Sequence, residues 1–293
     1  MKHSLTAMAV LIASALASAQ MPASGGGLLT RHYRDGETLT YHMTATNEDR
    51  HYTADTSGTA KKTASGSFVE EFHWTGSTLN GQPITLTPAI AQFVQILSLD
   101  PNSPPSMPDL SKADPRMIGP ITDLMTFYVD LWLINKIGIL QHPGDHFLVP
   151  SPQIGSWADG TQVLVGRSQI DFDLNLQSID TAKHTAAVVV HHVPPSHPNL
   201  QLPADWMQAP VADTANNWVQ VKKTKGGKYK AEVGKETFDV TIIVSTEDGR
   251  ILSATMDNPV VQIGRVCEDA ELTQCGIAQP HTIQRHIEIV LAQ

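Results

Sequence analysis

Apolar and polar residues alternate at every second position over much of this chain, the pattern of strands with one buried face. Residues 37–46 and 67–74 show it first, and the Asn80-Gly81 pair after them is a turn signal. From residue 145 onward further strand candidates lie at 162–177, 184–193, 218–223, 228–233, 237–245 and 250–256. Short links between the later strands force antiparallel neighbours, because a parallel return needs a crossover of about a dozen residues. The pattern predicts a long antiparallel meander.

Two segments between these regions change to a helical period. Ile90, Phe93, Val94 and Leu97 are spaced as on one face of a helix, and a longer apolar stripe follows Pro120. This stripe is typical of a core helix packed on a sheet, and equally of a lid over an apolar ligand cavity. As a lid it would bind the ligand through Ile121, Leu124, Met125, Tyr128 and Trp132. Charged residues inside the segment disfavour a membrane span.

The fold class expected from these elements is mainly β, of the α+β type. An antiparallel sheet of about ten strands rarely stays flat and open. We therefore expect a large curved sheet or half-barrel, with two helices packed on its concave face or forming a lid over it. Residues 37–293 are expected to form a single β-rich domain, and the Pro-rich stretch 194–210 is the boundary if there are two lobes.

The first 19 residues predict export. A cationic start is followed by an apolar run over residues 5–16 and by Ala17-Ser18-Ala19, which is the pattern of a secretory signal peptide. Residues 20–36 form a flexible, Gly-rich leader. The predicted cleavage site has no cysteine, so a bacterial lipid anchor is not expected. We expect a soluble protein in the periplasm or outside the cell.

Export gives a meaning to the two cysteines. Cys267 and Cys275 enclose seven residues between two alternating segments that read as a long hairpin. In an oxidising compartment this pair is expected to form a disulfide that closes the loop. A redox or metal-binding pair would require Cys-x-x-Cys spacing or histidines at metal-binding intervals.

Composition and charge exclude several classes of protein. Of the 293 residues 41% are hydrophobic and 17% are charged, which excludes a disordered chain. The formal net charge of -9 gives no electrostatic reason to expect nucleic acid as a partner. Lysines are unevenly spread, because six of them fall between residues 222 and 235. Lys222, Lys223, Lys225, Lys228 and Lys230 could dock on an anionic surface or acidic partner, or protect a sheet edge.

Candidate chemistry is sparse. Four histidines, His184, His191, His192 and His197, lie close in the sequence, but adjacent residues of a strand point to opposite faces, which argues against a metal site. Asp171 and Asp173 share one face of a strand, which suits a pair of catalytic carboxylates or a polar surface. No serine-hydrolase, phosphate-binding or His-Glu-x-x-His motif occurs. We expect no metal and no cofactor.

The expected architecture resembles the half-barrels of periplasmic lipoprotein carriers (LolA-like) and of the LppX-like group over about residues 37–291. Segments 216–221, 248–252 and 256–260 also look like parts of an uncharacterised family of secreted bacterial proteins. The hypothesis is a non-catalytic exported protein that binds a lipid-like or other hydrophobic ligand. Two alternatives stay open: an envelope hydrolase using the Asp and His residues, and an interaction module docking through the lysine hairpin.

Overall fold

The structure is a computed structural model. It describes residues 27–99, 117, 120–121, 138–150, 162–167, 171–193, 204–207 and 216–292. These residues form one sheet of 14 strands, in which every pairing is antiparallel. The predicted signal peptide, and the leader up to residue 26, lie outside the described residues. The proposed boundary at 194–210 lies largely outside them too.

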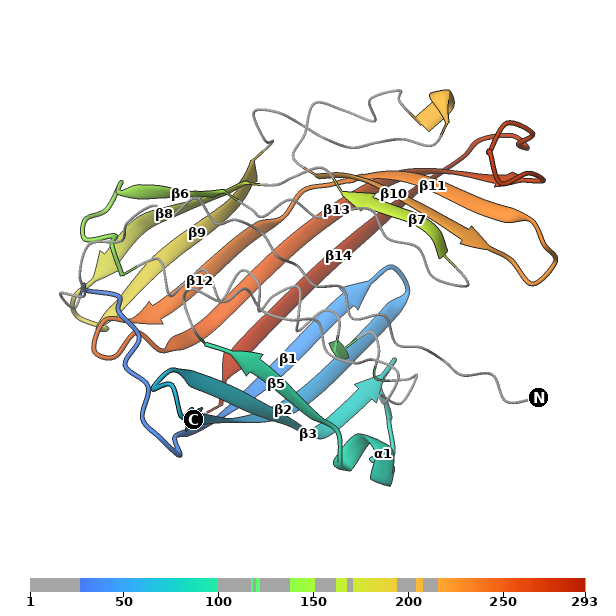
Figure 1. Cartoon of the computed structure of the whole chain (residues 1–293). Coiled ribbons are helices and arrows are strands. Elements are labelled where there is room, and N and C mark those ends of the chain that lie inside the picture. The colour runs from blue at the N-terminus through green and yellow to red at the C-terminus, as the bar shows by residue number, and fades with distance from the viewer. Residues whose placement is uncertain are drawn as a thin grey trace.

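The strands are β1 (Thr38–Asn47), β2 (Arg50–Lys62), β3 (Phe68–Leu79), β4 (Gln82–Pro83), β5 (Val94–Ser98), β6 (His146–Pro150), β7 (Gln162–Arg167), β8 (Asp171–Asp180), β9 (Thr185–Val193), β10 (Asn216–Lys223), β11 (Tyr229–Glu236), β12 (Asp239–Ser245), β13 (Ile251–Cys267) and β14 (Gln279–Leu291). The main path of the sheet runs β4-β3-β2-β1-β14-β13-β12-β9-β8-β6 (Figure 1). The predicted large antiparallel sheet is therefore confirmed.

The sheet forks at β13. This strand pairs with β14 along most of its length, so its other partners share the opposite edge. On that edge β12 pairs with residues 251–257, and β11 pairs with residues 260–267. From β12 the sheet continues to β9, β8 and β6, whereas from β11 it continues to β10 and β7 (Figure 1). Pro259 stands between the two partners, where a residue without a backbone N–H fits the gap in the ladder.

The prediction of two helices on the concave face is wrong. The spacing over Ile90–Leu97 yields a four-residue helix α1 (Pro88–Ala91) and then strand β5, which pairs with residues 69–73 of β3. Pairing β5 with an otherwise open stretch of β3 satisfies backbone groups that a helix there would leave exposed. Pro120 and Ile121 have helical backbone, but Leu124, Met125, Tyr128 and Trp132 lie outside the described residues. Within the described residues the protein is almost entirely β.

One face of the sheet forms the main hydrophobic core, and we call it the core face. It carries buried side chains from β1 to β3 and from β8, β9, β12, β13 and β14. Among them are Tyr41, Met43, Phe72, Trp74, Leu174, Val188, Ile242, Met256 and Ile287. Each such side chain contributes about 1.5–3 kcal/mol when it is fully buried. The opposite face, which we call the outer face, carries polar residues such as His42, Asp257 and His286.

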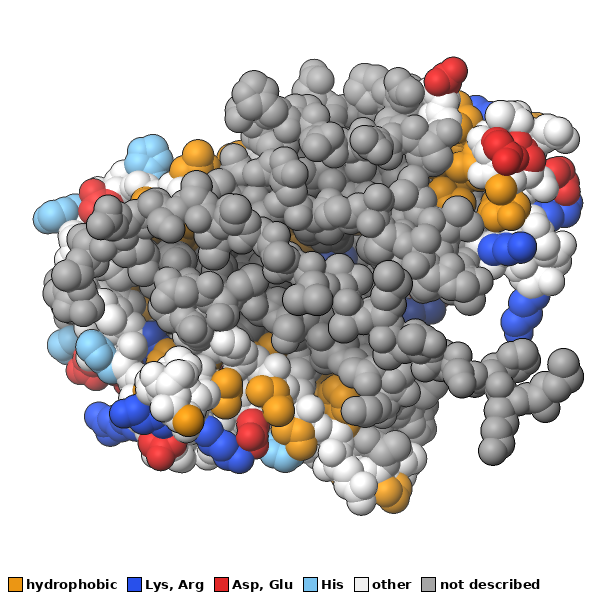
Figure 2. Space-filling model, viewed as in Figure 1, with side chains coloured by type: hydrophobic (Ala, Val, Ile, Leu, Met, Phe, Trp, Pro, Cys, Tyr) orange, Lys and Arg blue, Asp and Glu red, His pale blue; other side chains and the backbone are white. Residues whose placement is uncertain are grey.

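At the far end of β13 a second, smaller core lies on the outer face. Even-numbered residues of β13, such as Met256 and Val260, point to the core face. The register continues without a break to the end of the strand, so the odd-numbered Cys267 points to the outer face. It is buried with Val221, Ala231, Val233, Leu272 and Met207. Met207 belongs to the short helix η3 (Asp205–Met207), which lies over this end of the sheet (Figure 1). Beside it the β10–β11 hairpin carries the lysines, and basic side chains are visible at this end in Figure 2.

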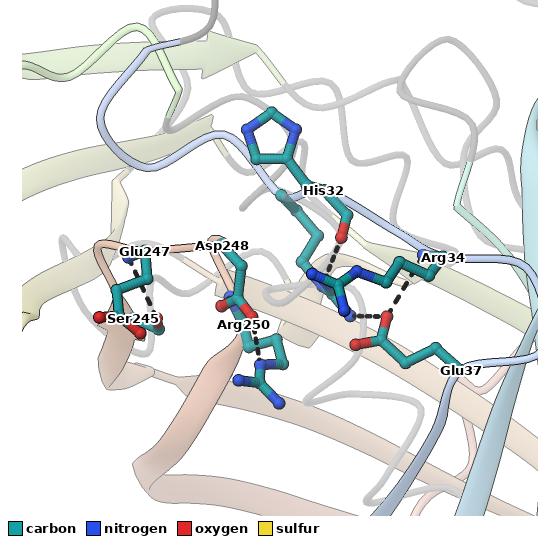
Figure 3. A network of polar contacts seen from close by, with 8 residues as sticks. His32, Arg34, Glu37, Ser245, Glu247, Asp248 and Arg250 are labelled. Atoms are coloured by element: carbon teal, nitrogen blue, oxygen red, sulfur yellow. Dashed lines mark hydrogen bonds and ion pairs between the residues drawn. The ribbon is translucent and has the colours of Figure 1, made fainter.

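Residues 27–37, which we call the N-terminal strap, are hydrogen-bonded to both the β12–β13 turn and β2. Figure 3 shows the strap residues His32, Arg34 and Glu37 and the turn residues Glu247 and Asp248. At one end the backbone N–H of His32 donates to the carbonyl of Asp248, 2.9 Å away, and at the other Gly36 donates to Ala60. Between them Nη2 of Arg31 lies 2.7 Å from Oε2 of Glu37. Gly249 permits the close approach, because a Cβ there would lie 2.5 Å from the carbonyl oxygen of Thr30.

Replacing Gly249 with alanine should destabilise the protein by about 3 kcal/mol, because a positive φ of 70° and a collision with the strap act together. Gly66→Ala is the matched control. Its φ is 88°, but no atom lies within 4 Å of the added Cβ, so about 1 kcal/mol is expected. Urea unfolding measures both variants. Equal losses of stability would show that the strap does not pack tightly against the turn.

Candidate functional site

Five buried side chains with polar atoms lie together on the core face of β1, β2, β3 and β5. They are Tyr41, Thr56, Glu70, Trp74 and Gln95, and their exposed fractions are 8%, 1%, 6%, 3% and 1%. We call them the buried polar cluster. Apolar side chains occupy most of the remaining core face. Such a group of polar atoms in a hydrophobic core is costly unless each atom finds a partner, and it is therefore the first candidate for a functional site.

The strand register places the five side chains next to one another. Tyr41, Thr56 and Trp74 stand opposite one another on three consecutive strands. Two residues before Trp74 on β3, Phe72 lies opposite Gln95 of β5. Two residues before Phe72, Glu70 lies opposite Leu97. Side chains in neighbouring positions of one sheet face are about 5–8 Å apart at Cβ, which is within reach of Trp, Gln and Glu.

Gly58 makes room for the carboxylate of Glu70. This glycine lies on β2 opposite Phe72, and a Cβ there would collide with Oε1 of Glu70. The Glu70 carboxylate therefore lies over the backbone of Gly58 and beside the Phe72 ring, instead of turning away to solvent. The space that the glycine leaves is filled by a polar group.

Several polar atoms of the cluster have no hydrogen-bond partner among the residues that the structure describes. These are both side-chain atoms of the Gln95 amide, the indole Nε1 of Trp74 and the hydroxyl of Thr56. Leaving a buried donor or acceptor unpaired costs about 1–3 kcal/mol for each group. A cluster of this kind persists in a stable protein when water or a ligand supplies the missing partners.

Burial and charge both act on Tyr41 of the cluster and on the nearby Tyr33. Burial raises the pKa of Tyr41 and Tyr33 well above that of an ordinary phenol, and the Glu70 carboxylate raises both pKa values further. Arg31 opposes this effect, and its guanidinium lies 4.4 Å from the centre of the Tyr33 ring. Both phenols are therefore neutral hydrogen-bonding groups near neutral pH.

Sequence reasoning missed this cluster. The alternation through Glu70, Phe72 and Trp74 places a carboxylate on the same face as two aromatic rings, and that local signal could have been noticed. Gln95 could not have been found in this way, because its segment was assigned to a helix. Of the residues predicted to bind a ligand, Ile121 is buried in the main core, and the other four lie outside the described residues.

The structure brings together part of the predicted Asp and His group on the outer face. Asp173 lies directly opposite His191 on the neighbouring strand. Nδ1 of His146 is 3.7 Å from Oδ1 of Asp173, and Nδ1 of His191 is 4.0 Å from Oδ1 of Asp239. The His191 and His146 side chains are half or more exposed, at 50% and 65%. These residues form a solvent-exposed polar surface.

Of the other members of that group, the structure describes the side chain of His184 alone. His184 lies in the turn between β8 and β9, where its Nδ1 is 4.0 Å from Oε1 of Glu247. His197 and the side chains of Asp171 and His192 lie outside the described residues. Within the residues that the structure describes, no three His, Cys, Asp or Glu side chains are placed to hold a metal ion.

The lysine hairpin is partly neutralised by its surroundings. Nζ of Lys228 is 2.6 Å from Oε1 of Glu268, and Nζ of Lys230 is 2.7 Å from Oε1 of Glu232. Lys223 lies near the ring of Tyr229, Lys225 is exposed at the tip, and the side chain of Lys222 lies outside the described residues. Both strands of the hairpin are paired on their other edges, β10 with β7 and β11 with β13, so protection of a free edge is not their evident role.

The disulfide prediction is confirmed, since Cys267 and Cys275 are bonded and their Cα atoms are 4.0 Å apart. Asp269 organises the loop that the disulfide closes. Its carboxylate accepts hydrogen bonds from the hydroxyl and the backbone N–H of Thr273 and from the backbone N–H of Gln274. These bonds, led by the Thr273 hydroxyl, lower the pKa of Asp269 to about 2.

No known protein family, curated protein or solved structure matches this chain. The resemblance to LolA-like half-barrels therefore stays a prediction, and the function must be argued from the site. Among the described residues, none of the helices has both the length and the apolar character that crossing a bilayer requires.

The pKa of Asp269 predicts how the disulfide loop responds to acid. Because the folded-state pKa lies below the ordinary value of 3.8, the ionised carboxylate stabilises the fold above about pH 4. That contribution is lost as the pH falls from about 4 through 2. Asp269→Ala should therefore lower the melting temperature at pH 6, and its difference from the parent protein should shrink towards pH 2. Glu271→Ala, in the exposed part of the same loop, is the control, and a pH-independent difference for Asp269→Ala would contradict the assignment.

Proposed function

We propose that this protein is an exported, non-catalytic binding protein for a small amphiphilic molecule with a lipid-like apolar part. The observation that carries the proposal is the group of polar atoms on Gln95, Trp74 and Thr56 that have no partner among the described residues, within a largely apolar core face. An amphiphile matches both properties, because its polar group supplies hydrogen bonds and its apolar part contacts the neighbouring aromatic and aliphatic side chains. Binding sites for small molecules commonly combine an apolar lining with a few placed polar groups.

The apolar part of the ligand would supply most of the affinity. Transfer of each methylene group from water to an apolar site contributes about 0.8 kcal/mol. The side chains suited to such contacts are the large ones that share the core face with the cluster, including Phe72, Met43 and Leu97. An alkyl or isoprenoid chain of moderate length would therefore bind measurably even with few polar contacts.

The polar part of the ligand would give orientation. Gln95 offers one acceptor and an NH2 donor, the Trp74 indole offers a donor, and the Thr56 hydroxyl offers either. Satisfying these atoms removes a cost that the unliganded protein bears. Preference for one orientation then follows, because reversing the ligand would leave the same atoms unpaired.

The two alternative functions are less well supported by the geometry. An envelope hydrolase using Asp173 and His191 would act from an exposed face, where both side chains contact solvent. A docking module would use lysines of which Lys228 and Lys230 are already paired with carboxylates. Ligand binding on the core face is the proposal that uses a feature otherwise unexplained.

Gln95→Leu tests the proposal, because it keeps the approximate volume of the side chain and removes both its donor and its acceptor. Affinity for monodecanoylglycerol, measured by displacement of a fluorescent apolar probe from the purified, delipidated full chain, should fall about 10-fold or more. The stability of the ligand-free protein should stay the same or rise, since an unpaired buried amide is lost. Gln82→Leu, on the exposed strand β4, should leave affinity unchanged.

Native mass spectrometry of the protein purified under mild conditions provides an independent check. A co-purified small molecule that is lost after delipidation is expected. Absence of any bound molecule, together with no measurable binding of monodecanoylglycerol, would show that the proposed function is wrong and that the cluster holds only water.

A further inference from the structure

We infer that the polar end of the ligand presents a carbonyl oxygen and an N–H donor side by side, as a primary amide does. The inference rests on the proposed function and names the chemical group that the site would recognise. It is carried by Gln95, whose amide oxygen and amide nitrogen are both buried and have no hydrogen-bond partner among the described residues. A ligand group that pairs with only one of these two atoms leaves the other one buried and unpaired.

The nearest neighbours of Gln95 on the core face are apolar. Phe72 lies directly opposite on β3, and Leu97 is the next residue of β5 that points to the same face. Phe93, just before the strand, also packs against this core. These three side chains have no group that can donate to the amide oxygen or accept from the amide nitrogen. A partner for the Gln95 amide would therefore approach from above the sheet, where a ligand on the core face would lie.

Trp74 and Thr56 add further hydrogen-bonding atoms next to the Gln95 amide. They stand opposite each other on β3 and β2, and Trp74 is diagonal to Gln95 because it follows Phe72 by two residues. The indole Nε1 of Trp74 can only donate, whereas the hydroxyl of Thr56 can donate or accept. Neither atom has a partner in the part of the chain that the structure describes. The site therefore offers several donors to one ligand oxygen, and it offers Oε1 of Gln95 to a ligand donor.

A primary amide on the ligand meets these requirements with one planar group. Its carbonyl oxygen accepts from Nε2 of Gln95, and its own N–H donates to Oε1 of Gln95, so that the two amides form a pair of parallel hydrogen bonds. The second lone pair of the ligand oxygen remains for the indole N–H of Trp74. An ester or a tertiary amide has the same oxygen but no donor, and it leaves Oε1 of Gln95 buried without a partner.

Two ligands with the same alkyl chain test the inference without any substitution. The purified, delipidated full chain should bind decanamide at least about 10-fold more tightly than methyl decanoate, measured by displacement of the same fluorescent probe. Binding to apolar surface alone predicts the opposite order, because a primary amide loses more hydration on burial than an ester. Equal affinities, or tighter binding of methyl decanoate, would overturn the inference while leaving the proposed function intact. Failure of both ligands and of monodecanoylglycerol to bind would instead contradict the proposed function.

Gln95→Leu and Trp74→Phe identify the side chain that makes the distinction. In Gln95→Leu the affinity for decanamide should fall about 10-fold or more, while that for methyl decanoate changes less than about 3-fold, so the preference is lost. Trp74→Phe removes a donor to the carbonyl oxygen that both ligands share, so both affinities should fall by a similar factor and the preference should remain. A preference for decanamide that persists in Gln95→Leu would overturn the inference. Circular dichroism and urea unfolding establish that both variants are folded.

Discussion

Burial of one face of β14 and β13 sets the register on which the rest of the sheet depends. Ile287 and Ile289 point into the main core, whereas His286 and Glu288 point to the outer face. A slip of one residue would bring an imidazole and a carboxylate among apolar side chains, so the hydrophobic effect selects one register. The same register brings Nδ1 of His286 to 2.7 Å from Oδ1 of Asp257. Polar pairing on the outer face is therefore a consequence of burial on the core face.

β13 connects two cores because it is longer than either of the two strands that pair with one of its edges. Its first part pairs with β12 over the main core, and its second part pairs with β11 beside the small core of the disulfide loop. Between them Nδ2 of Asn258 donates to the carbonyl of Thr237 at 2.7 Å. This bond binds the link between β11 and β12 to the middle of β13. The basic hairpin and the disulfide loop are consequently held at a distance from the buried polar cluster, and they are unsuited to contribute to one site.

The buried polar cluster is the main departure from the rule that polar side chains point outward. Glu70 and Gln95 occupy inward positions next to Phe72, Trp74 and Leu97, and the unsatisfied Gln95 amide costs stability that a leucine there would not. Proteins tolerate such losses of stability at functional sites, such as those that bind a ligand. Gly58 supports this interpretation, because its missing side chain makes space for a carboxylate.

The alternation of apolar and polar residues within short stretches of chain predicted most strands of this structure. It predicted little of the buried polar cluster. The alternation in β1, β3, β9, β12 and β14 and the disulfide within the β13–β14 hairpin could be predicted, because both signals lie within short stretches of chain. β2 was not predicted, since after Tyr52 its inward residues Ala54, Thr56, Gly58 and Ala60 are small or polar and give weak contrast. β5 was assigned to a helix, because a short apolar segment fits both periods and only its hydrogen bonds to the distant β3 decide between them. The sequence by itself thus determined which residues of most strands face inward. Tertiary structure alone brought Gln95 beside Trp74 and Glu70, because pairing between strands depends on contacts that no local periodicity records.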